Sequence, residues 1–115
     1  MRKGLSGTDG VEPRCRHAAE CGGCAWQHIA YAEQLRLKQR ALENLLSSAL
    51  GGAVPEVRPV VGMPVADDGM PWGFRQKAAF VFGAGPNGRG FRMGHFARGT
   101  NRAIAVDECP VHGDR

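Results

Sequence analysis

Four cysteines constrain what this chain can fold into more than any other feature. They are Cys15, Cys21, Cys24 and Cys109, and the 115 residues contain no other cysteine. Three lie within ten positions of one another and the fourth lies near the C-terminus, so a site using all four must be closed by the fold. Gly22-Gly23 permits a tight turn between two of them, since glycine reaches positive φ at little steric cost. A cubane iron–sulfur cluster needs four thiolates, and the pattern predicts a [4Fe–4S] site.

Zinc is the main alternative, because Cys-x2-Cys also occurs in zinc knuckles and His17, His28 and His112 lie near the cysteines in sequence. Structural zinc sites usually pair two short ligand spacings, whereas here three ligands cluster and one stands alone, which favours the cluster. A ferredoxin-type electron carrier is disfavoured because its ligand run is Cys-x2-Cys-x2-Cys. Disulfides are disfavoured because no apolar signal segment begins the chain, so we expect a reducing, cytoplasmic setting.

The rest of the sequence predicts an α+β fold: the cysteine-rich loop, one long helix and a small antiparallel sheet. We expect a loose tail over residues 1–13, one domain over 14–112, and the start of a link over 113–115. Leucines at helical spacing predict a helix from Tyr31 to Leu50, ended by Gly51-Gly52. A loop is expected over 62–71. The expected β-segments are an edge strand at 57–61 and strands at 74–82, 89–96 and 103–106.

Charge is unevenly distributed along the chain, whose formal net charge is +4. From Trp72 to Arg102 there are six basic residues and no Asp or Glu, and all five phenylalanines lie in the same stretch. Such a segment offers phosphate contacts and stacking surfaces together, which suits single-stranded or looped RNA. Alternatively, the phenylalanines form the core of the sheet and the arginines solvate its outer face. No apolar run reaches the ~20 residues of a membrane span.

The candidate RNA contacts are therefore basic and aromatic residues of this stretch. They are Arg75, Lys77, Arg92, His95, Phe96, Arg98 and Arg102. For His95 a structural or stacking role is favoured over general-base chemistry, because no carboxylate lies near it in sequence. Asp107-Glu108 precedes Cys109, and these carboxylates either close the fold or remain a solvated pair.

Several segments together resemble the RNA uracil-5-methyltransferases, which make 5-methyluridine. The first is Cys-x5-Cys-Gly-Gly-Cys-x2-Gln-His, followed by Tyr31-x2-Gln-Leu-x2-Lys38. Gly73-Phe-Arg-Gln-Lys77 is similar to the family's Tyr-Arg-Asn-Lys element, and Met93-Gly-His-Phe-Ala-Arg-Gly-Thr100 to its Gly-Phe-Tyr-x2-Gly-Ser element. Asp107-Glu-Cys-Pro110 is similar to the segment with the fourth cluster cysteine. The resemblance covers roughly residues 13–112, in the family's order.

The resemblance implies the cluster-bearing central part of an S-adenosylmethionine-dependent methyltransferase, with 23S rRNA favoured over tRNA as substrate. In the family an OB-like domain often precedes this part, and a Rossmann-like domain that binds S-adenosylmethionine follows it. That domain carries the nucleophilic cysteine and the general-base glutamate, and neither has a counterpart here. We therefore expect a monomeric fragment without catalytic or S-adenosylmethionine-binding residues, inactive alone. The alternative is a free-standing iron–sulfur or zinc RNA-binding module.

Overall fold

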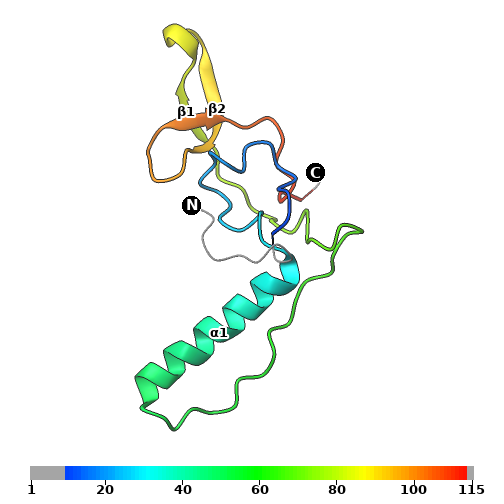
Figure 1. The fold of residues 1–115 in the computed structure, drawn as a ribbon. Coiled ribbons are helices and arrows are strands. Elements are labelled where there is room, and N and C mark those ends of the chain that lie inside the picture. The colour runs from blue at the N-terminus through cyan, green and yellow to red at the C-terminus, as the bar shows by residue number, and fades with distance from the viewer. Residues whose placement is uncertain (1–9, 114–115) are drawn as a thin grey trace. The chain divides into compact units, whose positions relative to one another are not determined.

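A computed structural model describes residues 10–113 (Figure 1). The fold is α+β, as predicted, with the element order α1, β1, a 3-10 turn, β2, β3. The described chain divides into two compact units, Gly10 with Ile29–Pro71 and Val11–His28 with residues 72–113. Most of the predicted tail and the end of the predicted link, residues 1–9 and 114–115, lie outside the described residues. The single domain over 14–112 remains a prediction.

The first unit is built around helix α1, Tyr31–Leu50, whose bounds confirm the prediction from the leucine spacing. Gly51 ends the helix with φ at 64°, and its N–H donates to the carbonyl of Ser47. Tyr31 is buried, whereas Leu42, Leu45 and Leu50 are 44–65% exposed within the described residues. No helix among residues 10–113 is long and apolar enough to span a membrane.

The predicted edge strand at 57–61 is wrong, because this segment is extended but pairs with no strand. It runs back along α1 (Figure 1), and a helix side chain satisfies its backbone instead. The amide of Gln39 donates to the carbonyl of Val57 at 3.2 Å and accepts from the N–H of Val60 at 2.9 Å. Pro55 and Pro59 have no N–H to donate to a neighbouring strand. A side chain of α1 therefore takes the place of that strand here. The loop predicted at 62–71 is confirmed.

The second unit contains the predicted antiparallel sheet, in the order β1-β2-β3. The strands are β1 Val81–Ala84, β2 Phe91–Phe96 and β3 Ala103–Ala105. Pro86–Gly88 forms the turn of the β1–β2 hairpin, where the N–H of Gly85 donates to the carbonyl of Gly90 at 3.1 Å. Strands β2 and β3 are slightly shorter than predicted, with the same placement.

Most of the strand predicted at 74–82 is wrong, since β1 begins only at Val81. The chain at 73–75 instead runs beside the C-terminal segment. Arg75 N–H donates to the carbonyl of Val111 at 2.8 Å, and Gly113 N–H donates to the carbonyl of Arg75 at 2.9 Å. This short parallel pairing of Arg75 with His112 fixes the residues that follow Cys109.

Strands β2 and β3 approach each other closely at Gly94. A Cβ atom there would lie 1.9 Å from the carbonyl oxygen of Ile104 and 2.7 Å from the nitrogen of Val106. Ile104 and Val106 belong to the small core of this unit, together with Cys21 and Ala97. Glycine at position 94 is therefore what lets the strand that carries His95 pack against the segment that leads to Cys109.

Substituting Gly94→Ala should destabilise the protein by about 2–3 kcal/mol, the usual cost of forcing extra volume into a packed site. Urea unfolding followed by circular dichroism measures this. The control is Gly88→Ala in the hairpin turn, where φ is 72° but nothing lies within 4 Å of the added Cβ. That variant should lose only about 1 kcal/mol, the cost of a left-handed backbone for alanine. Equal losses in both variants would contradict the close approach at Gly94.

Candidate metal centre

The cysteine loop is joined to the sheet by backbone hydrogen bonds that continue the pairing of β2. Gly22 N–H donates to the carbonyl of Phe96 at 2.9 Å, and Arg98 N–H donates to the carbonyl of Glu20 at 2.7 Å. Between these two bonds, Cys21 pairs with Ala97 as an antiparallel bridge. Cys21 is buried against Ala97, and the half-buried Cys109 packs on the same core. Two of the predicted ligands, 88 positions apart in sequence, thus share one apolar core.

Two arginine side chains hold the carbonyls of the cysteine loop. The Arg98 guanidinium donates to the carbonyls of Ala18, Cys21 and Cys24 at 3.0, 3.2 and 3.0 Å. Arg75 donates to the carbonyl of Gly23 at 3.3 Å. With their carbonyls bound, the loop residues are fixed in place, and two positive charges lie against the loop backbone.

Asp107 ties the segment after Cys15 to the segment before Cys109. Its carboxylate accepts from the guanidinium of Arg16 and lies 3.2 Å from Nε2 of His17. The Asp107 side chain is 63% exposed, so it bridges the two segments as a solvated carboxylate, and an exposed pair of this kind adds little stability. The same contact directs the His17 side chain toward the Asp107 carboxylate. His17 is not a member of the group of ligand atoms described below.

The Cys15 thiol lies close enough to the other three cysteines to be influenced by their charges, and none of the four forms a disulfide. Burial raises the pKa of the Cys15 thiol, the N–H of His17 lowers it, and the charges of Cys109, Cys21 and Cys24 raise it further. Backbone N–H groups point at two sulfurs, with His17 N–H at 3.4 Å from Cys15 Sγ and Gly23 N–H at 3.3 Å from Cys21 Sγ. Such bonds are typical of cluster thiolates. A bound cation would remove this repulsion, and four thiolates are the donor set that a [4Fe–4S] cluster needs.

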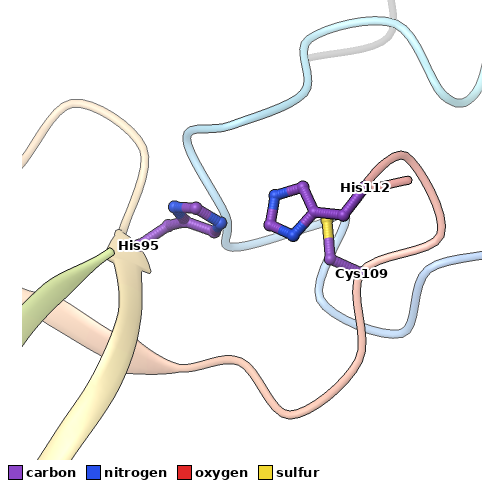
Figure 2. Close-up of side chains that lie close together, drawn as sticks. All are labelled: His95, Cys109 and His112. Atoms are coloured by element: carbon purple, nitrogen blue, oxygen red, sulfur yellow. The ribbon is translucent and has the colours of Figure 1, made fainter. Parts of the chain in front are cut away.

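A tighter group of possible ligand atoms involves only one of these cysteines. Atoms of His95, Cys109 and His112 all lie within 4.8 Å of one another, and no other such group occurs among residues 10–113 (Figure 2). His95 is stacked on Phe80, with ring centroids 5.4 Å apart and an interplanar angle of 24°. Burial lowers the pKa of His95, and the nearby charges of His112 and Arg75 lower it further, which favours the neutral ring.

The residues predicted to contact RNA fall in different environments. Lys77, Arg98 and Arg102 are exposed, as is Phe96, whereas Arg75, Arg92 and His95 are half-buried. Arg102 lies 3.8 Å from Glu20, an exposed pair of little energetic weight. Because Arg98, Arg75 and His95 have contacts inside the protein, they have clear structural roles, and RNA contact by any of the seven remains a proposal.

Sequence reasoning did not single out the exposed pair Phe82 and Phe91. Their side chains are 66% and 72% exposed, with ring centroids 5.7 Å apart. The strand register places Phe82 opposite Met93, so these two side chains and Phe91 share one face of the hairpin. We call Phe82, Phe91 and Met93 the hairpin surface. The sequence predicts that the phenylalanines of this stretch are either stacking surfaces or sheet core, and the exposure of Phe82 and Phe91 does not support the core.

Known relatives identify the kind of protein to which this chain is related. No protein-family model matches it. It is 35% identical over 105 residues to an uncharacterized RNA methyltransferase of Gloeobacter violaceus, covering 91% of this chain and 22% of the relative. It is 37% identical over 97 residues to the 23S rRNA (uracil(1939)-C(5))-methyltransferase RlmD of Pseudomonas fluorescens, covering 84% and 20%. The chain is a homologue of RNA methyltransferases.

The RlmD of Erwinia tasmaniensis agrees, at 33% identity over 101 residues, with 88% of this chain and 22% of the relative covered. These findings confirm the resemblance stated from the motifs. The homologous chain spans about a fifth of the length of the curated relatives it matches.

The Cys109→Ser variant tests whether the distant thiol is a ligand. In protein loaded with iron and sulfide, the melting temperature should fall by about 10 °C or more, because metal-binding energy contributes to folding and 1 kcal/mol corresponds to about 4–8 °C. Differential scanning calorimetry with iron analysis measures this. The control is the metal-free pair, wild type and variant, which should melt within about 2 °C of each other. A loaded variant with unchanged iron content and melting temperature would show that Cys109 is not a ligand.

The Arg98→Lys variant tests the carbonyl contacts of the cysteine loop. A lysine keeps the charge but lacks the planar fork that reaches several acceptors, so the metal-free protein should lose about 1–2 kcal/mol. Amide exchange at Gly22 and Gly23 should accelerate about fivefold to thirtyfold, the same range expressed as a rate. The matched control is Arg89→Lys in the hairpin turn. Unchanged exchange in the loop would contradict the role of Arg98.

Proposed function

We propose that this chain is part of an S-adenosylmethionine-dependent RNA methyltransferase that makes 5-methyluridine in 23S rRNA. The observation that carries the proposal is the match to RNA methyltransferases over 84–91% of the chain. Two of the three relatives described above are named as 23S rRNA uracil-C5 enzymes, which favours rRNA over tRNA. The use of S-adenosylmethionine is taken from the family resemblance, and the residues that bind it are not among those described.

Within such an enzyme, this chain would hold the cluster and part of the RNA-contacting surface. Cys15, Cys21, Cys24 and Cys109 would ligate a [4Fe–4S] cluster whose role is structural, since it joins the cysteine loop to the segment after β3. The support is the electrostatic closeness of the Cys15 thiol to the other three cysteines, the N–H groups directed at two sulfurs, and the two arginines on the loop carbonyls. A cluster supplies strong ligand bonds between segments that are distant in sequence.

The proposed RNA surface combines the acid-free basic stretch with exposed rings. Lys77, Arg92 and Arg102 would contact phosphates, while Phe96 and the hairpin surface would offer faces on which unpaired bases stack. We keep Arg75, His95 and Arg98 among the proposed RNA contacts, and we expect them to contribute less to RNA binding. Their side chains already contact other parts of the protein. Stacking and phosphate contact together favour single-stranded or looped RNA over a duplex.

The alternative is an RNA-binding module that does no chemistry. Deleting the gene that encodes this chain and measuring 5-methyluridine in 23S rRNA by mass spectrometry separates the two. Loss of one 5-methyluridine per rRNA, restored by the gene, supports the methyltransferase. An unchanged content, together with RNA binding by the chain, would favour the binding module.

RNA binding should be salt-sensitive and nearly indifferent to sequence. Four or five phosphate contacts give a log–log salt slope of about −3 to −4 on a single strand. Replacing Lys77 and Arg92 with alanine should flatten the slope by about one to two units. Fluorescence anisotropy with a uridine-rich oligonucleotide over a range of KCl concentrations measures it. Arg40→Ala on α1, an exposed residue of the other unit, is the control for loss of charge and should leave the slope unchanged.

The aromatic contribution is separable from the charge contribution. Replacing Phe82 and Phe91 with alanine should weaken binding by about 1–3 kcal/mol per stacked base while leaving the salt slope unchanged. If both double variants bind with wild-type affinity and slope, the basic residues only solvate the sheet and the RNA surface lies elsewhere.

A further inference from the structure

A group of three possible metal ligands is formed by His95, Cys109 and His112. The proposed four-cysteine site uses only Cys109 of these three. Figure 2 shows the two imidazole side chains pointing toward each other, with the sulfur of Cys109 beside His112. One ligand atom from each residue lies within 4.8 Å of the other two. The ring centroids of His95 and His112 are 5.6 Å apart, in an edge-to-face arrangement.

These separations suit one metal ion better than a cluster. With Zn–N of about 2.05 Å and Zn–S of about 2.3 Å, tetrahedral geometry places ligand atoms about 3.3–3.6 Å apart. Side-chain movements of about 1 Å would therefore close the group around one ion. In a cubane each thiolate binds a different iron, so its ligands stand farther apart than the ligands of one ion.

Ordered backbone fixes all three residues. His95 lies within β2, in register with Ile104 of β3. Cys109 and His112 are three positions apart, within a turn closed by His112 N–H donating to the carbonyl of Cys109 at 3.2 Å. The pairing of Arg75 with Val111 and Gly113 holds this turn in place. The spacing Cys-x2-His also lies within the range of short zinc-ligand spacings.

His95 is placed as a ligand would be. Its Nε2 atom is buried and has no hydrogen-bond partner among the described residues, a costly state for a polar atom. The stacking of its ring on Phe80 limits how far the side chain can rotate away. A metal ion is one partner that would satisfy this atom.

We propose that His95, Cys109 and His112 form a second metal site, for a single zinc ion, that competes with the cluster for Cys109. A cavity of about 550 Å³, lined by Cys109, His112 and Arg75 but not by His95, leaves room beside two of the three ligands for a water molecule. The charge of Arg75 opposes a cation, whereas the Cys109 thiolate attracts it. The proposed zinc site does not depend on the proposed cluster, whereas the competition for Cys109 does.

Cobalt and zinc titrations of the reduced, metal-free chain test the site. In the Cys15→Ser/Cys21→Ser/Cys24→Ser variant, one Co²⁺ should bind with a single thiolate charge-transfer band and be displaced by Zn²⁺. Adding His95→Gln or His112→Gln should weaken binding at least tenfold, since each removes a ligand. Adding His28→Gln is the matched control, because His28 lies outside the group, and it should leave the affinity unchanged. No cobalt binding by the folded triple variant, or an affinity indifferent to both histidines, would overturn the proposal.

Zinc X-ray absorption of the wild-type chain with one equivalent of Zn²⁺ gives a second readout if the triple variant does not fold. One sulfur and two imidazole nitrogens around zinc support the proposal, and four sulfurs refute it. In a cluster-assembly assay with iron and sulfide, one equivalent of zinc should slow assembly in the wild type at least threefold more than in the His95→Gln variant. If no cluster assembles under any condition, the proposed cluster fails while the zinc result stands.

Discussion

The structure of the second unit depends on the continuation of the β2 ladder into the cysteine loop. Two backbone hydrogen bonds, at Gly22 and Arg98, flank the pairing of Cys21 with Ala97. Through them a loop with three thiols becomes an extra edge of the sheet. The Arg98 side chain then binds three carbonyls of the same loop, so one residue contributes a backbone bond and a side-chain clamp. The site is thus positioned by ordered backbone before any ligand is bound.

The sequence predicted those elements that depend on interactions between residues close together in the chain. The helix from Tyr31 to Leu50 was predictable to the residue, because leucine spacing and Gly51 act within a few positions of each other. The three-stranded antiparallel sheet followed from alternation and from the glycine-rich turn. The resemblance to RNA methyltransferases also rested on short motifs, and relatives at 33–37% identity support it.

The errors concern residues whose partners are distant in sequence. The segment around Val60 looked like a strand because it is apolar and extended, but its backbone is satisfied by Gln39, 21 positions earlier. Charge alone predicts RNA contact for Arg98, but it does not predict that the guanidinium also binds carbonyls 74–80 positions away. The group at His95 joins a strand to a turn that sequence spacing does not bring together. In each of these three places, the partner of the residue depends on where its side chain points in the folded protein.

The position of Cys109 in the chain also determines when the site can be completed during synthesis. It follows Cys24 by 85 positions, and its neighbour Asp107 is bound by Arg16 and His17 from the opposite end of the described chain. At about 5–20 residues per second, a ribosome takes roughly 4–17 s to make the intervening segment. During that interval the thiols of Cys15, Cys21 and Cys24 are present without the fourth ligand of the proposed cluster. The time for which the nascent loop needs protection from oxidation and from other metal ions is therefore a few seconds. The order of residues in the chain sets this time, and the affinity of the site for its ligand does not.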